Sequence, residues 1–307
     1  MKRDLIDIQD LSPKEIERIL DLTVELKEDE SKSNNQLKDK AIALVFQKPS
    51  NRTRVSFEVG IWQLGGKCFY LGPDEINLGK RESTADAAKT LSRYLDGIVA
   101  RTFLHRDILD LAKYATVPVI NGLSDVSHPC QALADIFTIK ERFGRFKGIK
   151  VAYIGDGNNV CYSLLEACAK VGFKMSIATP KNYELNPHTI AVAKKMAKES
   201  DAKIEVGNSP TDAVKNAHVI YTDTWVSMWQ EAEAKKRLKD FEGFQVNSKL
   251  VAKADKDYIF MHCLPAHRGQ EVTADVIDGK HSVVFDQAEN RMHVQKAILI
   301  FLLGENK

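Results

Sequence analysis

The segment AIALVFQKPSNRTRVSFEVG, residues 41–60, indicates both the fold class and a first candidate ligand site. Its first six residues are apolar and predict a buried strand. The run VSFEVGIWQLGG, residues 55–66, has the pattern of a helix that ends at two glycines. A polar cluster, residues 50–54, therefore stands where a strand passes into a helix.

This strand-to-helix junction suits an anion. The free N–H groups and the positive dipole end at a helix start favour negative charge. Arg52 and Arg54, with the hydroxyls of Ser50 and Thr53, add the donors that a phosphate group takes. The alternative is a helix cap by Ser50 beside two solvated arginines. On this segment alone both interpretations stay open.

The bulk composition predicts two domains and argues against a nucleic-acid partner. The chain has 307 residues, 44% of them hydrophobic, and single cores stop growing near about 250–300 residues. A formal net charge of +2 is nearly balanced. This balance argues against a polyanionic partner such as nucleic acid, but it allows a small anion in a local pocket.

Cysteine usage predicts a reducing compartment. The five cysteines stand at positions 68, 130, 161, 168 and 263, an odd number without CxxC spacing, and no signal peptide opens the chain. We therefore expect free thiols. No apolar stretch is long enough to cross a membrane. The expectation is a soluble, cytoplasmic protein.

Apolar runs alternate with amphipathic segments in two series, which predicts two parallel-sheet α/β domains joined by helices. A capping box at Ser12 starts the first helix. The helix that joins the two series is expected from Pro129 to Phe143, and a last helix from about Asn290 to Leu303. The polar stretch 230–243 is expected to be a lid-like insertion rather than core. The predicted strands are AIALVF, KCFYL, GIVAR and VPVIN in the first series, and KVAYIG, KMSIAT, KIEVG, HVIYTD, DYIFMHC and SVVF in the second.

The GDG turn after KVAYIG partly matches a dinucleotide-binding fingerprint. Gly155 and Gly157 are present, but Val160 stands where the third glycine belongs, and KMSIATP ends without the acidic residue that would hold a ribose. A tight strand-to-helix turn is the simpler interpretation. A third is that Asn159 presents its amide to a polar ligand.

His128 directly precedes the helix that starts at Pro129, and Gln131 lies one turn further. A helix start disfavours the imidazolium ion, so a neutral His128 is suited to donate a hydrogen bond to a carbonyl oxygen. The alternative is a capping histidine without a ligand.

Later strand ends carry a thiol and a carboxylate. DYIFMHC ends at His262 and Cys263, and HVIYTD ends at Asp223. A free cysteine is often only a small buried hydrophobe, and a lone carboxylate often caps a helix. In parallel sheets, however, ligands bind beyond the carboxyl ends of the strands. There Asp223 would be placed to hold an ammonium group.

Two arginines occupy positions that an anion would explain. Arg101 closes the strand GIVAR, and Arg291 stands at the start of the predicted last helix. A cation at a helix start opposes the helix dipole unless an anion lies nearby.

Together these residues resemble the aspartate/ornithine carbamoyltransferase family, in order and spacing, over nearly the whole chain. The motifs that carry the resemblance are Ser50-Asn51-Arg52-Thr53-Arg54, Arg101, HPCQ at His128–Gln131, Asn159, the DxxxSM loop from Asp223 to Met228, HCLP at His262–Pro265, and Arg291.

The resemblance implies a role for each residue. The phosphate of carbamoyl phosphate would be held by Ser50, Arg52, Thr53 and the backbone amide of Asn51. The carbamoyl group would be contacted by Arg101, His128 and Gln131, and its end closed by Cys263, Leu264 and Arg291. The amine substrate would be bound by Asn159, Asp223, Ser227 and Met228. The catalytic residues would be Cys263, His128, Arg101 and Asp223.

The implied reaction is transfer of the carbamoyl group to the δ-amine of L-ornithine, giving L-citrulline and phosphate, with no metal or organic cofactor. Residues 1–135 would bind carbamoyl phosphate and residues 136–288 ornithine. Residues 289–307 would form a helix that returns to the first domain. Both arginine biosynthesis and the degradative direction are open, since concentrations, cooperativity and oligomeric state decide the direction.

Three positions depart from the family pattern. Asn51 stands where threonine is usual, and Trp229 follows the Ser-Met pair where glycine is usual. In the family a neighbouring subunit also reaches the phosphate site, and Asn77 is the corresponding position here. This sharing implies a homotrimer or a multiple of trimers.

Three alternative functions compete with this interpretation. The nearest is a carbamoyltransferase for another amine, such as putrescine or N-acetylornithine. The second is a nucleotide-dependent oxidoreductase built on the GDG turn. The third is a binding protein that keeps the fold without activity.

Overall fold

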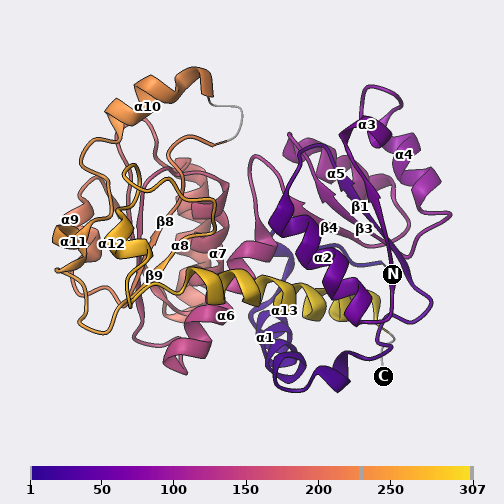
Figure 1. Cartoon of the computed structure of the whole chain (residues 1–307), viewed down its shortest axis with the longest axis horizontal. Coiled ribbons are helices and arrows are strands. Elements are labelled where there is room, and N and C mark those ends of the chain that lie inside the picture. Colours follow the sequence, from indigo (N-terminus) through magenta and orange to yellow (C-terminus); the bar gives the residue numbers. More distant parts are fainter. Residues whose placement is uncertain (1, 228–230, 305–307) are drawn as a thin grey trace. The chain divides into compact units, whose positions relative to one another are not determined.

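The computed structural model describes residues 2–227 and 231–304 and divides into two compact units. The first unit consists of residues 1–137 and 289–307, and the second of residues 138–288. The predicted boundaries were residues 135 and 288. The chain passes between the units inside two helices, α6 (Pro129–Phe143) and α13 (Val284–Leu303). Figure 1 labels both helices, together with strands β1, β3 and β4 of the first unit and β8 and β9 of the second.

The first unit is built on a four-stranded parallel sheet in the order β2-β1-β3-β4. Its elements are the short 3-10 helices Ile8–Asp10 and Glu30–Ser33, strands β1 (Ala41–Phe46), β2 (Lys67–Leu71), β3 (Gly97–Arg101) and β4 (Val119–Leu123), and helices α1 (Pro13–Glu28), α2 (Asn51–Gln63), α3 (Pro73–Ile76), α4 (Thr84–Leu91) and α5 (His105–Tyr114).

Local sequence explains where these elements begin. The capping box of Ser12 and Glu15 starts α1 as predicted. Ser50 is the N-cap of α2, and its hydroxyl accepts from the backbone N–H of Thr53 at 3.3 Å. Strand β1 lies in the middle of the sheet and is almost wholly buried, which explains its unbroken apolar run.

The second unit contains a five-stranded parallel sheet in the order β7-β6-β5-β8-β9. Its elements are strands β5 (Lys150–Ile154), β6 (Lys174–Ala178), β7 (Lys203–Gly207), β8 (Val219–Thr222) and β9 (Ile259–Met261), helices α7 (Asn159–Val171), α8 (Pro187–Ser200), α9 (Pro210–Val214), α10 (Ala234–Asp240), α11 (Ser248–Val251) and α12 (Ala274–Ile277), and the 3-10 turn Glu231–Glu233. The predicted fold class, two parallel-sheet α/β domains, is confirmed.

The end of the chain differs from the prediction. SVVF, residues 282–285, is not a strand: Ser282 makes a single bridge to Phe260, and Val284 already begins α13. Because α13 starts before Asn290, Arg291 lies about two turns inside the helix rather than at its start. The argument from the helix dipole therefore does not apply to Arg291.

The stretch 230–243 is not simply an exposed insertion. Arg237 on α10 is 4% exposed and Phe241 is fully buried. Phe241, Phe244 and Val246 belong to the hydrophobic core of the second unit. The expectation that this segment lies outside the core was wrong for Arg237 and Phe241, which are buried, whereas Leu238 between them is exposed.

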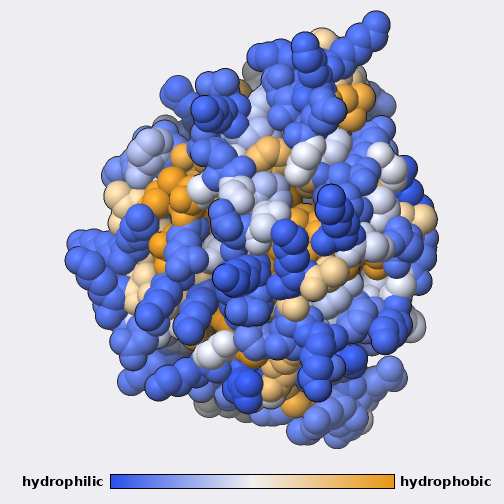
Figure 2. All heavy atoms as spheres, turned by 90° about the vertical axis from the view of Figure 1, so that its left-hand side faces the viewer, coloured by the Kyte–Doolittle hydropathy of each residue, from blue (hydrophilic) through white to orange (hydrophobic). Residues whose placement is uncertain are grey.

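None of the helices that the structure describes is long and apolar enough to cross a membrane. Figure 2 shows the face at the left of Figure 1, where the second unit lies. That face is mostly hydrophilic, and its hydrophobic areas are small and separate.

Gly157 occupies a position where no larger residue fits. A Cβ atom there would lie 2.6 Å from the backbone nitrogen of Leu185 and 2.7 Å from the carbonyl oxygen of Tyr183. We expect Gly157→Ala to lower the free energy of unfolding by roughly 1–3 kcal/mol, because backbone must move to admit the methyl group. Urea denaturation measures the change.

Gly207→Ala is the matched control, since a Cβ atom at Gly207 would meet nothing within 4 Å. Equal stability of the two variants would contradict the close backbone approach at Gly157.

Candidate active site

In the first unit, the predicted phosphate and carbamoyl residues gather at one edge of the sheet. The carboxyl end of β1 leads to Ser50 and α2, β3 ends at Arg101, and β4 leads to His128. These three strands are neighbours, so the residues that follow them share an edge. Arg291 joins them from α13, and its Nη2 donates to Thr53 Oγ1 at 2.8 Å.

The edge of the first unit carries buried positive charge. Arg101 and Arg291 are 5% and 4% exposed. Burial first, and then the charges of Arg291 and Arg101, lower the pKa of His128 well below its usual value. His128 is therefore a neutral imidazole at neutral pH, which can donate a hydrogen bond without adding charge. This neutral state agrees with the one expected from the helix start.

Lys48 also belongs to this edge, although the sequence interpretation did not include it. Burial and the nearby Arg101 lower the pKa of its ammonium group, and Asp125 raises it. The Nζ atom lies 4.8 Å from the centre of the Phe103 ring. The sequence could have indicated Lys48, because this lysine stands two residues before the phosphate motif that begins at Ser50.

Helix α6 carries Gln131 in its first turn, where its backbone N–H donates to the carbonyl of His128 at 3.1 Å. The side chain of Gln131 is 1% exposed, and its Nε2 donates to Asp135 Oδ1 at 2.8 Å.

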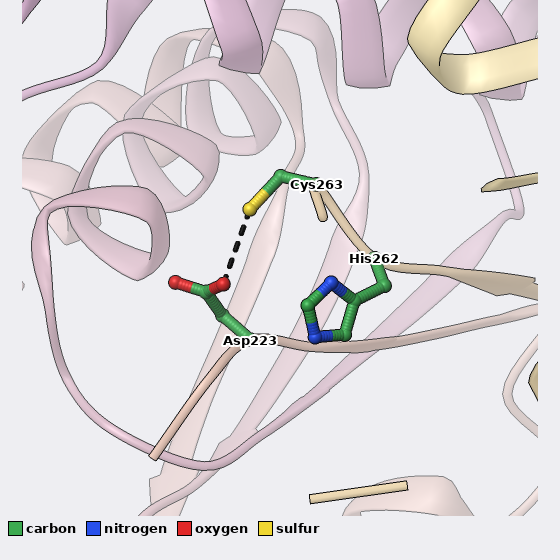
Figure 3. A group of neighbouring side chains, drawn as sticks. All are labelled: Asp223, His262 and Cys263. Carbon is green, nitrogen blue, oxygen red and sulfur yellow. Dashed lines mark hydrogen bonds between the residues drawn. The ribbon is translucent and has the colours of Figure 1, made fainter. Parts of the chain in front are cut away.

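In the second unit, Asp223 and Cys263 face each other across neighbouring strand ends, after β8 and β9 (Figure 3). The Sγ–H of Cys263 donates to Asp223 Oδ1 at 3.1 Å. Asn158 Nδ2 donates to the other carboxylate oxygen, Oδ2, at 2.7 Å. Two neutral donors thus orient a carboxylate that is only 5% exposed.

Asn158 is a residue that the sequence interpretation missed. It is the N-cap of α7, and its Oδ1 accepts from the backbone N–H groups of Val160 and Cys161 at 3.0 and 3.1 Å. The cap uses the oxygen and leaves the NH₂ group for Asp223. Asn159, which we predicted, is the first residue of α7 and is partly exposed. The preference of asparagine for N-cap positions was the available signal.

His262 holds the backbone next to Cys263. Its Nδ1 accepts from the N–H of Leu264 at 2.9 Å, and Leu264 has a left-handed φ of 58°. Its Nε2 lies 3.4 Å from Glu271 Oε1, and both side chains are fully buried.

Asp223, His262 and Cys263 are close enough to be considered as metal ligands, with donor atoms within 4.8 Å of one another. Both ring nitrogens of His262 face protein groups, however. Among the described residues this cluster offers three ligand side chains, and that of His262 is turned to Leu264 and Glu271, so the arrangement suits orientation of the loop better than metal binding.

The GDG turn has a role other than dinucleotide binding. Asp156 forms a buried ion pair with Arg237, whose Nε also donates to the carbonyl of Trp225. The guanidinium group lies 4.7 Å from the centre of the Tyr183 ring. Three loops at the carboxyl edge of the sheet thus meet at one arginine.

The remaining predicted residues are placed as follows. Asn51 is the exposed first residue of α2, with Arg52 partly exposed beside it. Asn77 is exposed and ends α3 in a left-handed conformation, with φ 38°. Ser227 is partly exposed. Met228 and Trp229 lie outside the described residues.

Comparison with known proteins covers both halves of the chain. Residues 3–141 match the carbamoyl-P binding domain of aspartate/ornithine carbamoyltransferases, and residues 147–302 match the Asp/Orn binding domain of the same proteins. The chain belongs to the aspartate/ornithine carbamoyltransferase family.

Similar proteins are matched over almost their full length. The ornithine carbamoyltransferase of Thermococcus kodakarensis is 55% identical over 98% of this chain and 96% of its own. The ornithine carbamoyltransferase of Bacillus subtilis is 52% identical over 98% of this chain and 94% of its own length. The solved structure of ornithine carbamoyltransferase from Pyrococcus furiosus has a TM-score of 0.96 at 54% identity, covering 100% of this chain and 98% of the other.

The Asp156–Arg237 pair predicts a pH dependence. Burial raises the pKa of Asp156 to about 6, although Arg237 lowers it. A carboxyl group that binds its proton more tightly in the folded chain lowers the free energy of unfolding as pH rises, here by about 2 kcal/mol between pH 4 and 7. In the variant Asp156→Asn this contribution is absent, and denaturant titrations at several pH values measure the difference.

We further expect Arg237→Met to raise the pKa of Asp156, because it removes the cation that lowers this pKa. Carbon-13 NMR of the carboxyl group reports the titration. Arg268→Met is the control, since Arg268 pairs with Asp278 at the surface. An unchanged Asp156 pKa in Arg237→Met would contradict the ion pair.

Proposed function

We propose that this protein transfers the carbamoyl group of carbamoyl phosphate to the δ-amine of L-ornithine, giving L-citrulline and phosphate. The observation that carries the proposal is the match of both halves of the chain to the two substrate-binding domains of the family. The cationic edge in the first unit and the oriented carboxylate in the second support it chemically.

In this proposal the phosphate is held at the start of α2. The first turn of this helix offers free backbone N–H groups, including that of Asn51. Ser50, Thr53 and Arg52 add side-chain donors, and Arg101 adds a buried positive charge. An asparagine at position 51 is compatible with this role, since the contribution required there is a backbone amide.

The carbonyl oxygen of the carbamoyl group gains negative charge as the tetrahedral intermediate forms. We assign its stabilisation to His128, Arg101 and Thr53. A neutral imidazole and a guanidinium fixed by burial need not reorganise when the charge appears. Loss of one such donor typically costs about 3–4 kcal/mol of transition-state stabilisation. Cys263, Leu264 and Arg291 are assigned to the carbamoyl end.

The attacking amine has to be uncharged. The pKa of the δ-ammonium of ornithine should resemble that of lysine, about 10.4, so a proton must leave it. We assign Asp223 to orient this group, with Cys263 beside it. Two proton acceptors fit this chemistry, the Asp223–Cys263 pair and the leaving phosphate. The reaction is an acyl substitution that requires no redox step, so no cofactor is proposed.

Ornithine rather than another amine is proposed from the Ser227-Met228 pair, with Asn159 as a further contact. A serine at this position suits an α-carboxylate, which putrescine lacks. Relatives at 50–55% identity that carry the name ornithine carbamoyltransferase support this choice. The name "anabolic" for the Pyrococcus furiosus relative supports the biosynthetic direction in arginine formation.

We also propose a homotrimer, or a multiple of trimers, in which Asn77 of one subunit completes the phosphate site of the next. Asn77 is exposed and therefore able to meet a neighbour. Val55 and Trp62 on α2 and Phe69 on the edge strand β2 are 54%, 75% and 49% exposed, an apolar surface that a second copy would cover. Free thiols at all five cysteines support a cytoplasmic location.

The first test is citrulline formation from carbamoyl phosphate and L-ornithine. We expect Arg52→Ala to weaken carbamoyl phosphate binding by roughly tenfold or more, since a charge-assisted hydrogen bond is lost. Ser227→Ala should raise the KM for ornithine and leave the KM for carbamoyl phosphate nearly unchanged. Initial rates at varied concentrations of each substrate measure both.

Putrescine and N-acetylornithine serve as competing substrates in the same assay. If either amine reacts faster than ornithine, that amine replaces ornithine as the proposed substrate. The proposed carbamoyl transfer would still stand. Absence of transfer to any amine would overturn the proposed function.

A shared site predicts complementation between two defective variants. Arg52→Ala removes one side of the phosphate site. Asn77→Asp keeps the shape and the left-handed backbone preference, but it adds a negative charge on the other side. Each homogeneous variant should have low activity, whereas hybrids formed by co-refolding should recover up to about a quarter of the sites. High activity of either variant alone would contradict a shared site. Hybrids of verified composition that recover no activity would contradict it as well.

A further inference from the structure

The buried side-chain amide of Gln131 forms a hydrogen bond through its nitrogen but none through its oxygen to the residues that the structure describes. Its Nε2 donates to Asp135 Oδ1 at 2.8 Å, one helical turn along α6. Its Oε1 is buried and makes no hydrogen bond to any described residue. Gln131 is 1% exposed and Asp135 is fully buried.

The contact with Asp135 fixes which end of the amide is which. Asp135 Oδ1 accepts in this contact, so the amide atom that faces it is the NH₂ group of Gln131. The side-chain amide is planar, and the carbonyl oxygen therefore points to the other side. A buried acceptor without a partner is unfavourable, so this orientation persists because the carboxyl group of Asp135 holds the NH₂ group.

The carbonyl oxygen of Gln131 can only accept a hydrogen bond, so it favours a ligand that donates one at this position. Gln131 lies in the first turn of α6, next to His128, at the edge where the phosphate and carbamoyl residues gather. The carbamoyl group has an NH₂ group, which is a donor, on the same carbon as its carbonyl oxygen. In acetyl phosphate a methyl group, which cannot donate, replaces this NH₂ group.

We propose that Asp135 is a positioning residue that holds the Gln131 side chain with Oε1 directed at the carbamoyl NH₂ group, and so makes the first unit prefer carbamoyl phosphate to other acyl phosphates. The inference rests on the proposed function, because it takes carbamoyl phosphate as the ligand. Asp135 acts only through Gln131 and does not touch the substrate.

The test compares the affinities of carbamoyl phosphate and acetyl phosphate for the full-length protein, by calorimetry or by competition in the citrulline assay. In Asp135→Asn the new amide can donate as well as accept, so Gln131 is free to turn over. We expect carbamoyl phosphate to bind roughly five- to tenfold more weakly, the value of one hydrogen bond, and acetyl phosphate within about twofold of wild type. Inhibition by inorganic phosphate should be unchanged, since it reports only the phosphate contacts.

Gln131→Leu provides a second variant that leaves Asp135 in place. It should lose the same preference for carbamoyl phosphate, and adding Asp135→Asn to it should have no further effect on that preference, because the two residues act as one unit. If Asp135→Asn fails to fold, retention of the preference in Gln131→Leu still overturns the proposal, because Asp135 can act on the ligand only through Gln131.

Equal weakening of both acyl phosphates in Asp135→Asn would show a purely structural role and overturn the proposal. Retention of the preference in either variant would overturn it as well. Wild-type protein that forms citrulline but binds both acyl phosphates equally would refute the inference and leave the proposed function intact. Wild-type protein that forms no citrulline would instead refute the proposed function.

Discussion

The parallel alignment of the strands is the constraint on which the rest of the structure depends. Parallel strands bring all of their carboxyl ends to one edge of the sheet, so residues far apart in sequence become neighbours there. In the first unit β1, β3 and β4 are adjacent, and the segments that follow them carry Ser50, Arg101 and His128. In the second unit β5, β8 and β9 do the same for Asn158, Asp223 and Cys263.

Burial gives the two edges opposite chemical characters. At the first edge, Arg101 and Arg291 remain charged because a guanidinium has so high a pKa, whereas His128 loses its charge. The result is a site with strong attraction for an anion and a neutral donor beside it. At the second edge, Asp223 is held by donors that carry no charge, so its negative charge stays available to a cation.

The edge of the second unit relies on supporting residues that touch no substrate in the proposed reaction. Asn158 divides its amide between the cap of α7 and Asp223. His262 fixes the peptide that precedes Leu264, and Arg237 joins three loops. Each support is a polar side chain with more than one partner, and His262 and Arg237 are buried, which makes the geometry of the site stiff.

Sequence by itself determined the fold class, most strand and helix positions, and the residues at the two edges. These features follow from local patterns: hydrophobic period, capping residues and motifs in register with a known family. Prediction from the sequence failed where contacts with distant segments decide the local structure or the burial of a residue. SVVF has strand composition but continues into α13, and 230–243 is polar overall but buries Arg237 and Phe241. Only the tertiary structure showed that Asn158 donates to Asp223, and that the side chain of Gln131 donates to Asp135. The direction of a buried side chain depends on partners that the local sequence does not contain.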